Sequence, residues 1–130
     1  MKAFDRAARS PDLGDAAGGA PTIRVVRIAA AASFYGTWLV SENEESPHLT
    51  LGKAKGELYI GCAEHDELAP LPMVAQLKDL FERSGNPGTL EMYPAVHHGF
   101  AFPLRAVYDK PAAEQHWERL LSLYKRRLKA

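Results

Sequence analysis

The run Glu57-Leu58-Tyr59-Ile60-Gly61-Cys62 is short, apolar and rich in strand-forming residues, which predicts a buried β-strand. A helix is predicted next, because Pro70 and Pro72 suit a first helical turn and Gly85 suits a helix end. Its apolar face would consist of Met73, Leu77, Leu80 and Phe81. Residues 89–93 predict another strand, and a strand, a helix and a strand in this order indicate a parallel pair covered by the helix.

The flanking segments extend the same alternation. Residues 29–35 predict a buried strand that Gly36 closes. Pro111 begins a last helix with an apolar stripe of Trp117, Leu120, Leu121, Tyr124 and Leu128. The predicted order of strand, strand, helix, strand, helix indicates an α/β fold with a parallel sheet flanked by helices. Residues 1–27 show neither helical nor strand periodicity, so the domain is expected over residues 28–130.

Length and composition limit the classes of protein to consider. A chain of 130 residues suits one domain, and its net charge of zero gives no electrostatic reason to expect nucleic acid or an anionic membrane as partner. No apolar run is long enough for a membrane helix, and no secretion signal is seen at the start. The single cysteine, Cys62, makes a cytoplasmic location the default expectation.

Two predicted loops carry residues suited to catalysis. Asp66 follows the strand at 57–62, and His98 follows the strand at 89–93. In open α/β sheets the working residues lie in the loops after the carboxyl ends of strands, so these two side chains can meet above the sheet. A carboxylate there would orient the imidazole and stabilise its charged form. An acid followed by a histidine is also the order found in α/β-hydrolases.

Several motifs together resemble the dienelactone hydrolase family. The motifs are Ala32-Ser33-Phe34-Tyr35-Gly36, Asp66-Glu67-Leu68-Ala69-Pro70, Tyr93-Pro94, His98-Gly99-Phe100, Tyr108-Asp109-Lys110 and the Trp117 helix. The resemblance covers roughly residues 28 to 129 and implies the C-terminal portion of an α/β-hydrolase. It also implies hydrolysis of a small-molecule ester or lactone without metal or organic cofactor. By resemblance Asp66 is the triad acid and His98 the base, and His97 is the rival for the second role.

The family's nucleophile has no recognisable counterpart in this chain. The family places a cysteine or serine in Gly-x-Cys/Ser-x-Gly-Gly, on a strained turn between a strand and a helix. The nearest match is Gly14-Asp15-Ala16-Ala17-Gly18-Gly19, where Ala16 takes the nucleophile position. Cys62 lies within or at the end of a predicted strand and is expected to be a buried core thiol.

Binding residues are less constrained by the sequence. Tyr35 and Trp38 follow the first strand's end and are candidates to line a substrate pocket, with core packing as the alternative. Arg105 could bind an acidic substrate or be a solvated loop residue. Phe102 stands near the place where the resemblance expects an arginine, which argues against a dienelactone carboxylate as substrate. The scattered histidines show no metal-ligand spacing.

A second hypothesis belongs to a different class. The chain would be a truncated, catalytically silent hydrolase remnant that acts as a self-associating or interaction module. Half a sheet leaves an unpaired edge strand and uncovered apolar surface, and both favour a partner or a homo-oligomer. A reactive serine or cysteine within hydrogen-bond reach of His98 would distinguish the enzyme from this remnant.

Overall fold

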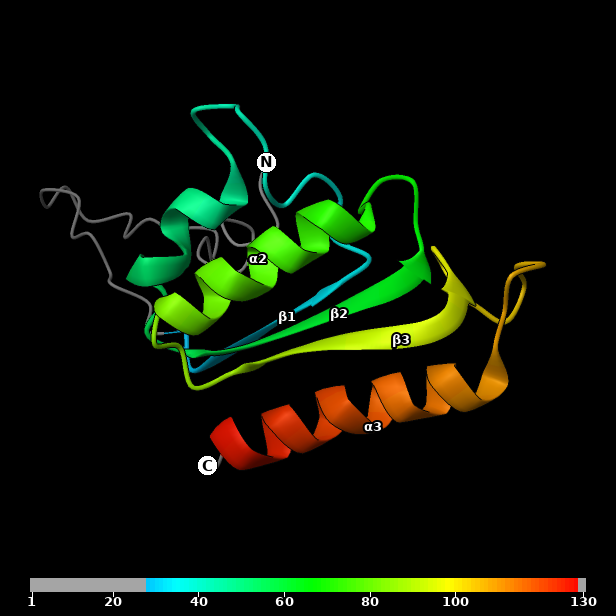
Figure 1. Cartoon of the computed structure of the whole chain (residues 1–130). Coiled ribbons are helices and arrows are strands. Elements are labelled where there is room, and N and C mark those ends of the chain that lie inside the picture. Colours follow the sequence, from blue (N-terminus) through cyan, green and yellow to red (C-terminus); the bar gives the residue numbers. More distant parts are fainter. Residues whose placement is uncertain (1–27, 129–130) are drawn as a thin grey trace, which may run out of the picture.

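The computed structural model of the protein describes residues 28–128. In that range a parallel sheet has the strand order β1-β2-β3, with helices on both sides (Figure 1). The elements in chain order are β1 (Ala30–Phe34), η1 (Pro47–Lys53), β2 (Glu57–His65), α2 (Leu71–Arg83), β3 (Thr89–His97) and α3 (Lys110–Arg127). The predicted α/β fold class is therefore confirmed.

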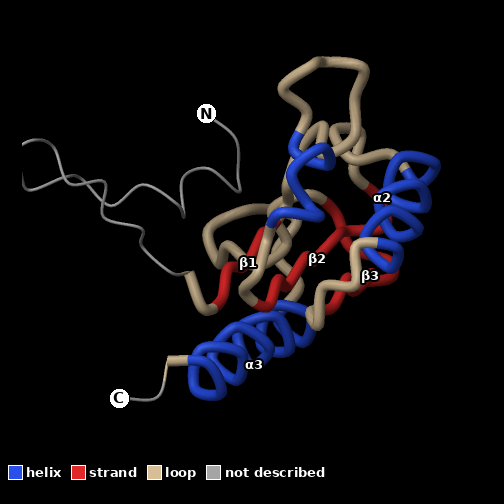
Figure 2. The backbone as a smooth tube through the Cα atoms, turned by 90° about the vertical axis from the view of Figure 1, so that its left-hand side faces the viewer, coloured by secondary structure: helices blue, strands red, loops and turns tan. Residues whose placement is uncertain are grey.

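Alternation along the central strand builds two cores, one on each face of the sheet. Leu58, Ile60 and Cys62 belong to the core beneath α2 and η1. Tyr59 and Ala63 belong to the other core, which α3 covers. Figure 2 shows the two helices on opposite sides of the sheet, with α3 beneath β1 and α2 on the side of β3. Burial on both faces explains why β2 is almost continuously apolar.

Local signals fix the helix ends. α2 begins after Pro70 and ends just before Gly85, whose φ of 69° suits glycine. Asp109 caps α3, where its side chain accepts a hydrogen bond from the Ala112 amide at 2.9 Å. Among residues 28–128, no helix is both long and apolar enough to cross a bilayer.

The strands differ from the predictions in length. β2 continues to His65 and β3 to His97, past the expected ends at residues 62 and 93. The polar residues at these ends pair in the ladder, where His65 lies opposite His97, so hydrophobicity alone does not mark the boundary. The 3-10 helix η1 was not predicted, although Pro47 at its start is a suitable signal.

The buried face of α3 is not the predicted stripe. Trp117, Leu121 and Leu128 are 46%, 66% and 60% exposed, whereas Ala113, His116 and Leu123 are buried. Leu120 and Tyr124 from the stripe are half-buried, and Tyr124 packs against the core. The prediction was wrong for the three exposed residues because the face that packs on the sheet is centred on a histidine and an alanine, which hydrophobic periodicity does not emphasise.

Candidate active site

Asp66 lies immediately after β2, in the turn that leads to α2. Its side chain is 1% exposed. One carboxylate oxygen, Oδ1, accepts a hydrogen bond from the Leu68 amide at 2.9 Å, and the Asp66 carbonyl accepts one from the Ala69 amide at 3.2 Å. Both bonds belong to the turn itself, so local backbone geometry holds the carboxylate with its second oxygen free for another partner.

His98 supplies that partner from the loop after β3. Its Nδ1 lies 2.7 Å from Asp66 Oδ2, and its backbone amide donates to the His65 carbonyl at 3.3 Å. A carboxylate can only accept, so Nδ1 carries the hydrogen. No hydrogen bond between described residues involves Nε2, and the side chain is 33% exposed. The predicted contact between these loops is present, and it leaves a histidine nitrogen open toward solvent.

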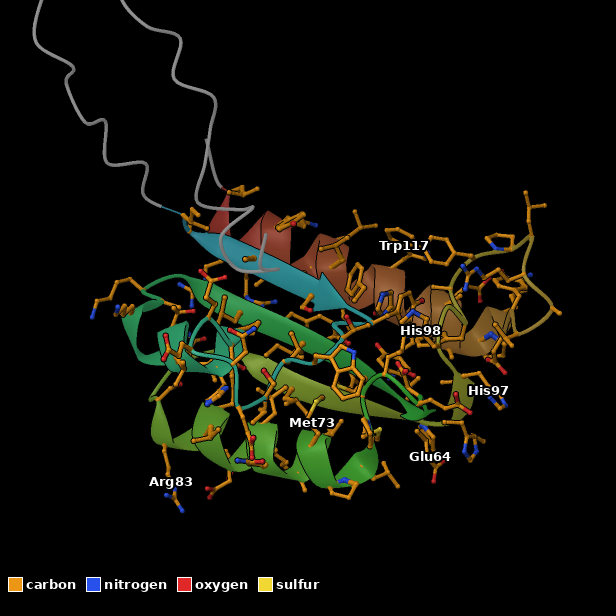
Figure 3. The ribbon with its side chains drawn as sticks, turned by 90° about the horizontal axis from the view of Figure 1, so that it is seen from above. Glu64, Met73, Arg83, His97, His98 and Trp117 are labelled. Atoms are coloured by element: carbon orange, nitrogen blue, oxygen red, sulfur yellow. The ribbon has the colours of Figure 1, made fainter. Side chains whose placement is uncertain are left out.

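His97 does not share this arrangement. It lies on the outer side of the β3 end, where its ring is 5.0 Å from that of His65. Figure 3 shows the labelled side chains of His97, His98 and Glu64 at the same end of the sheet. Of the two neighbouring histidines the structure brings only His98 to Asp66. Nowhere in residues 28–128 do three His, Cys, Asp or Glu side chains group as a metal site requires.

Tyr35 lies directly beside the pair. Its ring centroid is 5.4 Å from that of His98, and its hydroxyl accepts a hydrogen bond from the Ala101 amide at 2.8 Å. Burial is the main cause that raises the pKa of its phenol, whereas the Ala101 bond and the charge of Arg105 act in the opposite direction. Tyr35 therefore anchors the loop that carries His98, and its ring lies tilted against the imidazole.

Trp38 is more exposed and is held through its backbone. Its amide donates to the Leu68 carbonyl at 3.1 Å, which joins the segment after β1 to the turn of Asp66. Trp38 and Tyr35 both have positive φ angles, 50° and 53°. Non-glycine residues seldom adopt this conformation, and such strain concentrates near functional sites.

The loop after His98 carries two further candidates. Gly99 has a φ of 89°, and a Cβ there would lie 2.8 Å from a guanidinium nitrogen of Arg105. The same guanidinium is 5.7 Å from the ring centroid of Phe102, which in turn lies 5.8 Å from the Tyr35 ring. Arg105 thus packs against Gly99, which is next to His98. It therefore lies closer to the Asp66–His98 pair than its position in the sequence suggested.

Cys62 is a core thiol, as predicted. It is buried among the side chains that α2 covers, and burial raises its pKa to about 11, with the charge of Asp66 adding to the effect. No hydroxyl or thiol within residues 28–128 forms a hydrogen bond with His98. The segment Gly14 to Gly19, the nearest sequence match to a nucleophile turn, lies outside the described residues.

His116 is the residue that sequence reasoning missed. It is fully buried in α3, and neither ring nitrogen has a hydrogen-bond partner. Its ring stacks on Tyr35 with an interplanar angle of 8° and lies 3.6 Å from the Phe34 ring centroid. Burial lowers its pKa to about 4, against a smaller opposite effect of Glu91. Only its position among the inward-facing residues of α3 could have indicated that its ring is buried against Tyr35 and Phe34.

A cavity of about 410 Å³ lies between α3 and the amino-terminal parts of β2 and β3, away from Asp66 and His98. Its acidic side chains have partners. Glu57 is paired with Arg126 at 2.6 Å and with Arg127 at 2.5 Å, and Glu91 with Arg119 at 3.2 Å. These pairs tie α3 to the sheet and offer no free group for chemistry.

Sequence similarity to known proteins identifies the family of the chain. The sequence profile of the dienelactone hydrolase family matches residues 17–128. The chain belongs to the dienelactone hydrolase family. The match begins inside the N-terminal segment that lacked periodicity, one residue after Ala16.

Relatives of this dienelactone hydrolase-family protein are longer than the chain. A Synechocystis protein with the provisional name carboxymethylenebutenolidase is 28% identical over 105 residues, which are 78% of this chain and 43% of that protein. The crystal structure of a provisional dienelactone hydrolase from Klebsiella pneumoniae superimposes with a TM-score of 0.66 at 20% identity, over 74% of this chain and 41% of the other. A dienelactone hydrolase-like promiscuous phosphotriesterase from metagenomic libraries gives 0.63 at 19% identity, over 76% and 42%. The chain therefore spans less than half the length of these relatives, and the structural matches show the shared fold.

Proposed function

We propose that Asp66 and His98 are the acid and base of an ester or lactone hydrolase site, in a chain where no nucleophile is recognisable. The observation that carries this proposal is the 2.7 Å contact between a buried carboxylate and a partly exposed imidazole with Nε2 open. The carboxylate holds the tautomer in which Nε2 carries a lone pair. That nitrogen is where a base must accept a proton.

The chemistry follows from this tautomer. Nε2 takes the proton of an attacking hydroxyl, thiol or water, and Asp66 stabilises the imidazolium that forms without accepting the proton itself. The proton then passes to the departing alkoxide. Without a nucleophile in reach, the pair can only assist water as a general base, which is worth about 10²–10⁴-fold.

The substrate class comes from the family and from the residues around His98. We propose a small carboxylic ester or lactone, with Tyr35 and Trp38 lining its site, because Tyr35 lies against His98 and Trp38 is anchored to the Asp66 turn. The name of the Synechocystis relative also denotes a lactone hydrolase. The unpaired, buried Cys62 favours a reducing compartment such as the cytoplasm.

Turnover of a p-nitrophenyl ester by the 130-residue chain tests the proposal. We expect very weak turnover that falls to the buffer rate in His98→Ala and stays unchanged in Cys62→Ala, since Cys62 is a buried thiol. Turnover above the buffer rate that survives His98→Ala would contradict the assignment. Loss in both variants would instead make Cys62 a candidate nucleophile.

We also propose an alternative, a catalytically silent and self-associating module, because one specific feature favours it. β1 pairs only with β2 among the described residues, and Trp117 extends past it on α3 (Figure 3). The Trp117 ring contacts Phe34 of β1 at 6.0 Å between centroids and is nearly half exposed. A free strand edge beside exposed apolar side chains favours association. Complete absence of ester turnover would support this alternative.

A further inference from the structure

We propose that Glu64 is a positioning residue for His98, and this inference rests on the proposed role of the Asp66–His98 pair. Glu64 precedes Asp66 by two residues, at the end of β2, and its Oε2 accepts a hydrogen bond from the Ala95 amide at 2.5 Å. Ala95 precedes His98 by three residues. The same two chain segments that carry the pair are thus joined a second time.

Three links connect these segments in succession. The Glu64 carboxylate binds the Ala95 amide, the His65 carbonyl binds the His98 amide, and the Asp66 carboxylate binds the His98 ring. Only the last link involves a reacting group. The first two fix the backbone from which His98 projects.

The link through Glu64 lies where β3 is irregular. Ala63 lies opposite Tyr93 and His65 opposite His97, so one residue of β2 faces three residues of β3. The extra residues include Pro94, which has no amide hydrogen to give the ladder, and Ala95, whose φ is 58°. A regular ladder would not hold this bulge, and the Glu64 side chain supplies an acceptor for the amide in its middle.

The bulge decides which histidine meets Asp66. Successive residues of a strand point to opposite faces, so a change in the number of residues in the bulge would exchange the directions of neighbouring side chains. With the observed bulge, His97 lies over His65 and His98 meets Asp66. Glu64 is 40% exposed, which favours action through the geometry of its hydrogen bond over action through its charge.

Nuclear magnetic resonance of the 130-residue chain tests this role without an ester substrate. The two observables are the downfield signal of the His98 Nδ1 hydrogen, assigned by its loss in His98→Ala, and solvent exchange of the Ala95 amide. In Glu64→Ala and Glu64→Asp we expect exchange to be faster by about fivefold, the effect of losing one hydrogen bond. The Nδ1 signal should also be broadened or lost in both variants. The alanine side chain has no acceptor, and the aspartate side chain is too short to reach Ala95.

Two variants serve as controls. Glu64→Gln keeps an acceptor oxygen at the same reach and should retain both observables. Glu67→Ala removes an exposed carboxylate from the same turn and should leave both unchanged. Unchanged observables in Glu64→Ala would overturn the proposal, and so would retention in Glu64→Asp with loss in Glu64→Gln, since charge would then be the cause. If Glu64→Ala does not fold, the Asp and Gln variants decide. Failure of ester turnover leaves these results unaffected, so the two proposals fail separately.

Discussion

At the scale of single residues, the two adjacent histidines 97 and 98 offer a direct comparison. His98 shares a hydrogen bond with a buried carboxylate, whereas His97 contacts another exposed ring. Removing one partner of a buried pair leaves the other uncompensated. Because His98 is partly exposed, we expect His98→Ala to lower the free energy of unfolding by about 1–3 kcal/mol, below the range for fully buried pairs. His97→Ala should cost less than about 0.5 kcal/mol.

Urea unfolding followed by circular dichroism measures both values. Equal losses in the two variants would contradict the different environments of the two rings. A larger loss in His97→Ala would point to an unrecognised role for its stacking on His65.

His116 provides a prediction about pH. Its folded-state pKa of about 4 lies below the ordinary value of 6.5, so the unfolded chain binds the proton more readily. Its neutral, buried form therefore stabilises the fold fully above about pH 6.5, and this contribution is lost as the pH falls toward 4. The loss attributable to His116 is at most about 3 kcal/mol.

We expect His116→Phe to remove this part of the acid sensitivity, since phenylalanine fills the same space against Phe34 and Tyr35 without titrating. Unfolding free energies at about pH 7 and about pH 4.5 should differ less in His116→Phe than in the wild type. His97→Phe makes the same substitution at an exposed ring and is the matched control. An identical acid loss in His116→Phe and the wild type would show that His116 does not titrate as inferred.

At the scale of elements, apolar runs and helix-end residues were sufficient to predict the strands, the two α-helices and their order. They were not sufficient to find the ends of β2 and β3, because parallel pairing carries both strands through polar residues such as Glu64 and His65. The buried face of α3 was also predicted incorrectly. Ala113 and His116 lie inward on that helix and are the residues a hydrophobic pattern passes over.

Leucines 121 and 123 of α3 test the corrected face. Leu123 is buried and Leu121 is 66% exposed, although the sequence pattern placed only Leu121 in the core stripe. We expect Leu123→Ala to lower the free energy of unfolding by about 2–4 kcal/mol and Leu121→Ala by less than about 1 kcal/mol. Thermal and urea unfolding in dilute solution, where association does not contribute, would check this. A larger loss in Leu121→Ala than in Leu123→Ala would instead support the buried face that the sequence pattern predicted.

The candidate pair was predictable because it depends on topology. Parallel strands place the loops after their carboxyl ends side by side, so an Asp after one strand and a His after the next can meet. The choice of His98 over His97 depended on the family resemblance, since the bulge at Pro94 and Ala95 that settles it leaves no signal in hydrophobicity. The positions of Glu64 and Arg105 could not be predicted, because they arise from contacts between loops.

At the scale of the whole molecule, the described part of the chain has helices on each face of its sheet and open strand edges at β1 and β3. Trp117, Leu121 and Leu128 expose apolar surface on α3, and the Trp117 ring reaches Phe34 of β1. Parallel sheets in isolated domains are normally covered, and edges that remain open tend to pair. These features place the predicted association at the β1 side of the molecule.

Leu121→Glu tests that location. A charge at an exposed leucine should leave the monomer folded, since the side chain has little core contact, but it should oppose burial of the surface in an interface. We expect sedimentation velocity to show concentration-dependent association for the wild type and weaker association for Leu121→Glu, by about tenfold or more in the dissociation constant. Leu49→Glu, at a comparably exposed leucine of η1 on the opposite face, is the matched control and should associate like the wild type. A wild type that remains monomeric at high concentration with a high melting temperature would refute self-association. Equal weakening by both variants would show that the association is not specific to the exposed face of α3.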